Sequence, residues 1–444
     1  MGKVATSEAK SSIPLHLGSN ITLLPTQNST NGSITKEMAT YILLFFGISF
    51  FKSQSIFLDP RLWAEEGSNF YQNCVASSTL YCLTRTFMGS YLILTNTITY
   101  LSTLVPVLYA PLVTTYLTLL LHLALVAQIV VFSRAYALSR VTTALLVSAI
   151  ALLPAMSEVW MTSTNVQWLT GVSVLWLFVM PTGWLEQHWK GAAFWSAICG
   201  LSGIPAAIMT PLFVARGIID RSRAILLIGA VLAACTIFQA VILAETPMSH
   251  YRSFPTNLLT LVGPLLLQTV LAPLFSPDFA TALGQAAGTE RVVAGTALWG
   301  TAIVGFGVVV LIVKAAWSRV PTCLLILTLV AWVFVTLVQI FGGLGSEWFL
   351  SGLGGSRYFL FGSMCLCIVL AWATLAEIKM LKSAAMGLLS VAVLSGALAA
   401  AFSPALYSRF TGPSWRQQID SCPPAKSCHV VIWPGKPWGV DIVK

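Results

Sequence analysis

The chain of 444 residues is too apolar for an ordinary soluble domain. Hydrophobic residues make up 57% of it and charged residues only 9%, whereas soluble domains are nearer half apolar and a quarter charged. Uncharged apolar runs of about 20 residues recur from end to end, long enough to cross a bilayer as helices. The net charge of +9 comes from Lys and Arg scattered singly along short loops, which argues against a nucleic-acid partner. Composition therefore predicts an all-α polytopic membrane protein.

We expect about eleven transmembrane helices, with boundaries good to about four residues. Their expected ranges are 39–57, 103–132, 141–157, 168–183, 191–201, 203–215, 224–244, 294–313, 321–341, 358–376 and 384–402. The stretch 258–275 is nearly long enough to cross, but a crossing there would move the Lys and Arg residues of every later loop to the opposite side. We therefore expect it to be an interfacial or re-entrant helix.

The distribution of charge predicts the orientation. Lys and Arg are more frequent in the loops that lie inside when the N-terminus is cytoplasmic, as the positive-inside rule requires. This predicts a disordered cytoplasmic tail over 1–38, a transmembrane domain over 39–402 and a small extracytoplasmic region over 403–444. Acidic residues are more numerous in the expected outer loops, which favours the outer face as the place of any chemistry.

The first expected outer loop contains an unusual acidic and aromatic stretch, "DPRLWAEEGSNFYQ". Its side chains include Asp59, Trp63, Glu65 and Glu66. Carboxylates beside aromatic rings at a bilayer surface are partly desolvated, which raises their affinity for a proton and suits a general base. One glutamate would take the proton while the other holds a metal or orients the site. The alternative is a solvated loop with a Trp at the membrane interface.

Two further loops offer groups for the same site. The second outer loop, "SEVWMTSTNVQWLTG", provides Glu158 and Asn165 as hydrogen-bonding groups and Trp168 as a ring face, which suits a sugar as well as an aromatic belt. The loop "GGSRYF" provides Arg357 and Tyr358, and an Arg at the membrane surface binds phosphate or simply reaches water. The remaining candidates are Lys52 for the same phosphate and His250 and Arg252 for substrate.

The cysteines form two close pairs on the expected outer side. Cys74 and Cys82 share the first outer loop, and Cys422 and Cys428 share the C-terminal region. An oxidising compartment would allow each pair to form a disulfide. Spacing alone does not fix the geometry, so free thiols remain the alternative for both pairs.

With these loops assembled, the chain resembles the GT-C superfamily of integral-membrane glycosyltransferases. It is most similar to bacterial members that use polyprenyl-phosphate sugars, including the serotype-converting glucosyltransferases of phage and enterobacteria. The motifs that carry the resemblance are "WAEEG", "TNVQW", "GGSRYF" and the tail "WRQQIDSCPPAKSCHVVIWPGKPWGVDI". Many relatives have an Asp in the acidic pair where this chain has Glu65 and Glu66.

The resemblance implies a reaction at the outer face of a bacterial inner membrane. A sugar on polyprenyl phosphate is transferred with inversion to a cell-surface glycan such as an O-antigen. The family's first-loop acid corresponds to Glu65 or Glu66, with Glu65 favoured as the base, and its phosphate-binding residue corresponds to Arg357. Some members require a divalent metal and others do not, so a metal remains possible. The alternatives are a transporter or flippase, and an O-antigen polymerase or ligase that acts on lipid-linked glycans.

Overall fold

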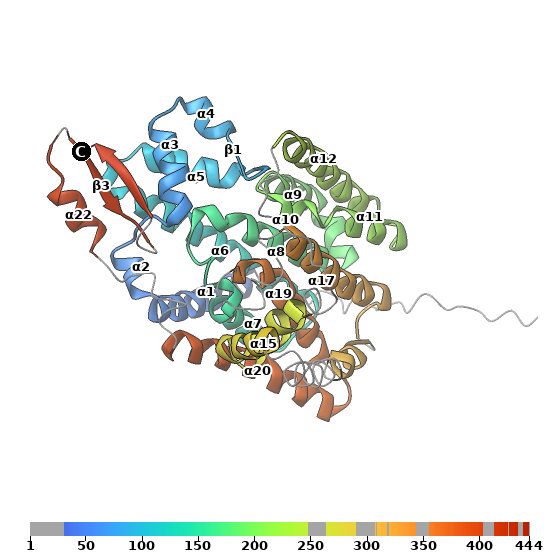
Figure 1. The fold of residues 1–444 in the computed structure, drawn as a ribbon. Helices are drawn as coiled ribbons and strands as arrows, with labels where there is room; N and C mark the ends of the chain where they lie inside the picture. Colours follow the sequence, from blue (N-terminus) through green and yellow to red (C-terminus); the bar gives the residue numbers. More distant parts are fainter. Residues whose placement is uncertain are drawn as a thin grey trace, which may run out of the picture.

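The protein is represented by a computed structural model that describes residues 31–246, 263–289, 307, 309–317, 319–342, 355–402, 413–424, 426–433 and 438–443. In these residues the chain is mainly helical, and its strands form two separate antiparallel pairs (Figure 1). The helices of eight residues or more are α1 (Asn31–Lys52), α5 (Ile93–Thr103), α6 (Ala110–Ala135), α7 (Arg140–Leu152), α8 (Val166–Phe178), α9 (Thr182–Gly200), α11 (Thr210–Ile219), α12 (Arg223–Glu245), α15 (Pro277–Thr289), α17 (Thr322–Gly342), α19 (Leu360–Ala373) and α20 (Lys379–Phe402).

Shorter elements connect these helices. They are α2 (Gln54–Leu58), the π-helical turn η1 (Glu66–Tyr71), α3 (Gln72–Val75), α4 (Thr79–Thr84), β1 (Thr86–Phe87), β2 (Ser90–Tyr91), η2 (Val107–Tyr109), η3 (Pro154–Met156), η4 (Ser163–Asn165), α10 (Ile204–Ala207), η5 (Leu267–Leu271), α14 (Ala272–Leu274), η6 (Ser356–Phe359), α22 (Trp415–Ser421), β3 (Ser427–Val431) and β4 (Gly439–Val443).

The described residues include five helices that are long and apolar enough to cross a membrane. At a rise of about 1.5 Å per residue, a helix of 18 residues or more is comparable in length to the hydrocarbon core of a bilayer. These helices mark the chain as a membrane protein. They are Val107–Ala135, Arg223–Glu245, Thr322–Ile340, Ser356–Ala373 and Lys379–Phe402.

Helix α19 lies at the centre of the bundle. Every side chain from Leu360 to Ala373 is buried, and the helix packs against α7, α8, α17 and α20. A helix that is apolar on all sides avoids water only inside other helices or lipid. The outer helices instead expose large apolar side chains, including Leu120 on α6, Ile237 on α12 and Leu398 on α20, as expected of surfaces that face lipid.

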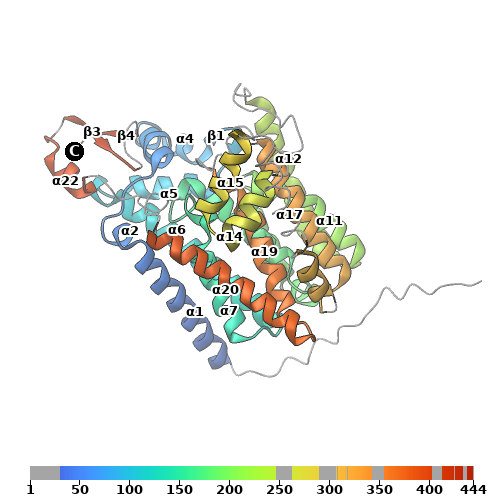
Figure 2. The ribbon, with the colours of Figure 1, turned by 60° about the horizontal axis from the view of Figure 1, so that its bottom comes forward.

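Contacts between helix ends fix how the first helices alternate. Glu37 near the start of α1 accepts a hydrogen bond of 2.8 Å from Nε of Arg134 at the end of α6. Lys52 at the other end of α1 donates to the carbonyl of Ala151 at the end of α7. Thus α1 and α7 point the same way and α6 points the opposite way (Figure 2). Thr142 near the start of α7 also lies 3.4 Å, between hydroxyl oxygens, from Thr374 just after α19, so α20 begins at the same end of the bundle as α1.

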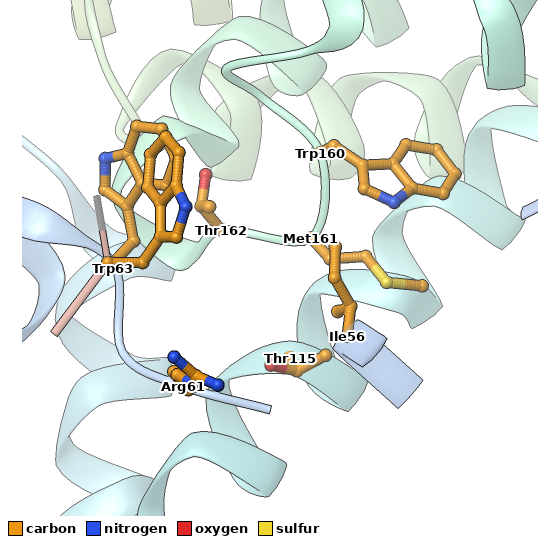
Figure 3. Close-up of a pocket in the computed structure, with 8 residues that line it drawn as sticks. Ile56, Arg61, Trp63, Thr115, Trp160, Met161 and Thr162 are labelled. Carbon is orange, nitrogen blue, oxygen red and sulfur yellow. The ribbon is translucent and has the colours of Figure 1, made fainter. Parts of the chain in front are cut away.

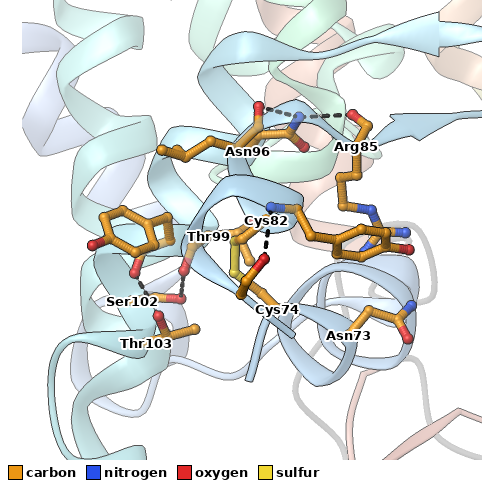
Figure 4. Close-up of a disulfide and its surroundings, with 12 residues drawn as sticks. Asn73, Cys74, Cys82, Arg85, Asn96, Thr99, Ser102 and Thr103 are labelled. Carbon is orange, nitrogen blue, oxygen red and sulfur yellow. Dashed lines mark hydrogen bonds between the residues drawn. A yellow bond between two sulfur atoms is a disulfide. The ribbon is translucent and has the colours of Figure 1, made fainter. Parts of the chain in front are cut away.

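The segment between α1 and α6, residues 53–109, is a folded unit that we call the first loop. A disulfide joins Cys74 to Cys82, with 4.8 Å between their Cα atoms (Figure 4). The amide of Asn96 on α5 donates to the carbonyls of Leu83 and Arg85, at 3.2 and 2.8 Å, and so ties α5 to the end of α4. These contacts give the loop a defined shape before α6 begins.

The C-terminal segment, by which we mean the described residues from 413 to 443, packs on the first loop. Antiparallel β3 and β4 and helix α22 share a small apolar core with Leu62, Tyr71 and Ala110. A second disulfide joins Cys422 to Cys428, with 5.9 Å between the Cα atoms. Both cysteine pairs considered from the sequence are thus the pairs that the structure joins. The C-terminal segment lies beside the first loop in both ribbon views (Figures 1 and 2).

Several expected helix boundaries differ from the observed ones. The helix expected over 39–57 begins at Asn31 and ends at Lys52, so 31–38 is helical rather than disordered, and α2 is separate. The expected 103–132 span is divided near Pro106, because proline lacks an N–H and disfavours helix at the preceding residue. In the same way α7 ends before Pro154 rather than at 157, and α8 ends before Pro181 rather than at 183.

Helix α9 begins at Thr182 rather than at 191, because hydropathy does not detect its polar start "TGWLEQHWK". The helix is kinked at His188, whose backbone is not helical (φ −114, ψ 17). The span expected over 203–215 is divided into α10 and α11. Residues 263–274 form one of the shorter apolar helices, and 258–262 and most of the span expected over 294–313 lie outside the described residues. Helices α12, α17 and α20 coincide with expected spans to within about five residues, close to the boundary error of such predictions.

Candidate functional site

Glu66 is a buried carboxylate that joins three parts of the chain. Its side chain is only 2% exposed. Oε2 accepts a hydrogen bond of 2.9 Å from the backbone N–H of Trp63, and Oε1 accepts from the backbone N–H of Ser163 at 3.0 Å and from the Ser163 hydroxyl. Thr114 on α6 adds a side-chain hydrogen bond. Since its acceptor positions are occupied by protein donors, Glu66 orients the site rather than meeting a substrate.

The bond from Trp63 to Glu66 also explains the local fold. The helical turn begins at Ala64, so Glu66 is the third helical residue and reaches back to the N–H of the residue that precedes the helix. This is one half of a capping box. Burial raises the pKa of the Glu66 carboxyl above its ordinary value of 4.5, and the hydrogen bonds from Ser163, Trp63 and Thr114 oppose part of that rise.

Glu65, the neighbouring carboxylate, is only partly buried and points to different partners. Its Oε2 accepts a hydrogen bond of 3.2 Å from the indole Nε1 of Trp63. It also interacts electrostatically with Arg357, which is distant in sequence. Of the two glutamates, Glu65 is therefore the one that a second molecule can reach.

Arg357 lies in a turn that Glu158 fixes. Glu158 Oε1 accepts hydrogen bonds from the backbone N–H groups of Gly355 and Ser356, at 2.7 and 3.2 Å, and Oε2 lies 3.6 Å from Arg357 Nη1. Gly355 has φ +72, a left-handed conformation that favours glycine. The Ser157 and Ser356 hydroxyls, 3.1 Å apart, add a second link between the two loops. The arrangement holds Arg357 beside the carboxylate of Glu158 and within electrostatic range of that of Glu65.

The aromatic residues expected at the site have protein partners. Trp168 and Tyr358 pack edge to face with ring centroids 4.8 Å apart, which brings the second loop and η6 together. Trp63 instead stacks on Trp433 of the C-terminal segment, with centroids 4.0 Å apart. The indole N–H of Trp168 is buried and has no hydrogen-bond partner.

Other expected site residues have structural contacts. Asp59 accepts a hydrogen bond of 2.9 Å from the Ser414 hydroxyl and pairs with Arg61 at 3.3 Å, so it attaches the C-terminal segment to the first loop. Asn165 is buried and donates to the carbonyl of Glu158 at 2.6 Å. Both were predicted to contact substrate, and in the structure both contribute to the shape of the loops.

The remaining phosphate and substrate candidates were Lys52, His250 and Arg252. Lys52 donates to Ala151 and lies over the Trp160 ring, 4.4 Å from its centroid. His250 and Arg252 lie outside the described residues.

A small pocket opens beside Trp63 (Figure 3). In Figure 3, Trp63, Arg61 and Thr162 lie toward one side of it, and Trp160, Met161 and Ile56 toward the other. Thr115 of α6 and Trp433 complete the lining. The pocket therefore lies where two loops, a membrane helix and the C-terminal segment meet.

A divalent metal does not fit the carboxylates found here. Among the residues that the structure describes, no three His, Cys, Asp or Glu side chains gather as a metal site would require. Glu66 is occupied by hydrogen-bond donors and Glu158 by Arg357 and two backbone N–H groups. We therefore derive no step through a metal.

Sequence reasoning missed three residues that organise the site. Ser163 and Thr114 hold Glu66, and Trp433 covers Trp63. Ser163 is inside the same Ser/Thr-rich stretch as Asn165, and Trp433 is in the "VVIWPGKPW" stretch, so both were near features already singled out. Neither stretch indicates its partner, because the contacts join residues far apart in the chain.

Comparison of the chain with protein-family models, with curated protein sequences and with solved structures finds no match.

Proposed function

We propose that this membrane protein is an inverting glycosyltransferase that moves a sugar from a polyprenyl-phosphate donor to a cell-surface glycan. Glu65 is the general base. It takes the proton of an acceptor hydroxyl as that oxygen forms a bond to the anomeric carbon. The bond from that carbon to the phosphate oxygen breaks on the opposite face, and the phosphate leaves with the electron pair. Help from a general base is typically worth about 10²–10⁴ in rate.

The observation that carries the proposal is the accessible carboxylate of Glu65, which interacts electrostatically with the guanidinium of Arg357. The buried Glu66 holds the first loop against the second through Ser163. A base for the acceptor and a cation for the leaving phosphate are the two groups that this transfer needs. Arg357 has five N–H donors, so pairing with Glu158 uses only part of its capacity, and a phosphate can share the rest.

We propose further that the loops of this site face the outside of a bacterial inner membrane. The alternation of α1, α6 and α7, and the start of α20 at the same end as α1, agree with an odd number of crossings such as the eleven expected. The excess of Lys and Arg in the expected inner loops supports the cytoplasmic N-terminus. In that topology the C-terminal segment is extracytoplasmic, and its disulfide and that of the first loop lie in an oxidising compartment. Alkaline phosphatase fused after Lys444 is then active. An inactive fusion, with an active cytosolic reporter at the same position, contradicts this orientation.

A transporter or flippase, and a polymerase or ligase of lipid-linked glycans, are the rival functions. Transporters place ionisable residues near the middle of the membrane, whereas Glu65, Glu66 and Glu158 lie in segments between the long helices. We therefore favour the transferase.

The experiment that separates these functions is mass analysis of cell-surface glycans from cells with and without the gene. If the protein is a transferase, glycan chain length is the same in both kinds of cell, and the cells with the gene have one more sugar per repeat. A polymerase or ligase changes chain length or attachment, and a flippase causes lipid-linked precursor to accumulate. Either of the last two results contradicts the proposal.

A further inference from the structure

Trp63 of the first loop packs against the C-terminal segment. Its ring stacks on Trp433, with an interplanar angle of 25°. The backbone on both sides of Trp63 pairs with the backbone of Trp433: Ala64 N–H donates to the Trp433 carbonyl at 2.7 Å, and Trp433 N–H donates to the Leu62 carbonyl at 3.3 Å. The backbone N–H of Trp63 itself donates to Glu66. Both the backbone and the ring plane of Trp63 are thus fixed.

The ring plane decides where the one polar atom of the indole points. An indole has a single donor and no acceptor. In this orientation Nε1 of Trp63 donates to Oε2 of Glu65. Rotation of the ring about its side-chain torsions would carry Nε1 away from the carboxylate, and the stack on Trp433 opposes that rotation.

Trp433 is itself well anchored. Gln418 on α22 accepts from the N–H of Val431 and donates to its carbonyl, at 2.9 and 3.0 Å. Trp415 donates from its indole to the carbonyl of Val107 at 3.2 Å, and Ser414 donates to Asp59. The C-terminal segment is therefore attached to the first loop at separate points around the Trp pair.

We propose that Trp433 is a positioning residue that acts through Trp63 to hold the Glu65 carboxylate in its reactive orientation. The inference rests on the proposed function, in which Glu65 is the base. It makes the C-terminal segment a part of the active site, although this segment is separated from Glu65 by almost the whole chain.

The test compares four variants of the full-length protein. Trp433→Ala removes the stack, while the backbone pairing around it does not require a Trp. Trp63→Phe keeps a ring against Trp433 but lacks the N–H. Trp438→Ala is the matched control, because Trp438 packs into the core of the C-terminal segment and tests general loosening of that segment. Trp433→Phe, which keeps an aromatic face, should behave like wild type.

Two readouts are needed. The first is modification of Glu65 by a water-soluble carbodiimide, followed by mass spectrometry, which does not depend on any enzymatic activity. We expect modification to rise about three-fold to ten-fold in Trp433→Ala and Trp63→Phe, the range that one hydrogen bond supplies, and to be unchanged in Trp438→Ala. The second is the separation of kcat from KM in sugar transfer: kcat should fall about three-fold to ten-fold in the same two variants, while KM for the donor is unchanged.

The outcomes distinguish this inference from the proposed function. The inference is overturned if Glu65 is modified to the wild-type extent in both Trp433→Ala and Trp63→Phe. It is also overturned if modification rises equally in the Trp438→Ala control. If modification rises as expected while even the wild-type protein transfers no sugar, the positioning by Trp433 is supported and the glycosyltransferase proposal fails. If kcat and KM for transfer are the same in all variants, Trp433 does not position the base.

Discussion

Glu66 accepts hydrogen bonds from both the backbone N–H and the hydroxyl of Ser163, and this pair joins the first loop to the second. The two residues come from segments on either side of α6 and α7. Because Thr114 on α6 also bonds Glu66, the carboxylate fixes the loops relative to a membrane helix. The orientation of the neighbouring Glu65 depends on this junction.

Replacing Glu66 by Gln should destabilise the junction by about 1–3 kcal/mol, the cost of leaving buried donors unsatisfied. An amide keeps one oxygen, but its NH₂ group must then face the N–H of Trp63 or of Ser163. We expect a lower melting temperature for purified Glu66→Gln at mildly acidic pH. Glu245→Gln is the control, because Glu245 is an exposed carboxylate at the end of α12. Equal melting temperatures of the two variants would show that Glu66 does not hold the loops.

The pKa of Glu66 predicts how this difference varies with pH. Burial raises the pKa in the folded protein above 4.5, so the folded state keeps its proton to a higher pH than the unfolded chain does. The contribution of this group to the unfolding free energy is therefore fully present below pH 4.5 and is lost as the pH rises through the folded-state pKa. The wild-type melting temperature should accordingly fall relative to that of Glu66→Gln as the pH is raised. Parallel curves for the two proteins would contradict the raised pKa.

Arg357→Ala should weaken donor binding rather than the chemical step. A charge-assisted hydrogen bond to phosphate is worth about 1.5–3 kcal/mol, so we expect polyprenyl phosphate to bind about ten-fold to one-hundred-fold less tightly. Arg357→Lys should recover only part of the affinity, because an ammonium lacks the planar fork of the guanidinium. Arg416→Ala, a change of an exposed Arg on α22, is the control. Unchanged binding of polyprenyl phosphate to Arg357→Ala would remove this residue from the donor site.

The sequence was most informative about apolar helices and local motifs. The long spans α12, α17 and α20 follow from uninterrupted apolar runs, and the disulfide candidates follow from close spacing. The polar start of α9 and the division at Pro106 were missed because hydropathy reports burial in lipid and not the hydrogen-bonded helix itself.

The site was predicted as a set of residues but not as a set of contacts. Glu65, Glu66 and Arg357 were all identified from local composition. The different tasks of the two glutamates follow from their partners: Ser163 and Thr114 enclose Glu66, while Glu65 lies beside Arg357. Trp433 lies in a tail stretch that was already singled out, but nothing in that stretch indicates Trp63 as its partner, since its role depends on where the C-terminal segment packs. Such long-range contacts follow from the packing of the whole bundle and cannot be read from one stretch.

Single-turnover sugar transfer by Glu65→Gln tests whether Glu65 is the general base. The amide keeps the size of the side chain and can still accept the hydrogen bond from Trp63 through its oxygen, but it cannot take a proton at neutral pH. With the donor and acceptor identified by the glycan comparison, the account predicts a folded protein that binds polyprenyl phosphate normally and transfers sugar about 10²–10⁴ times more slowly. Glu245→Gln should transfer at the wild-type rate. Transfer by Glu65→Gln at a rate near that of wild type would contradict the assignment of Glu65 as the base.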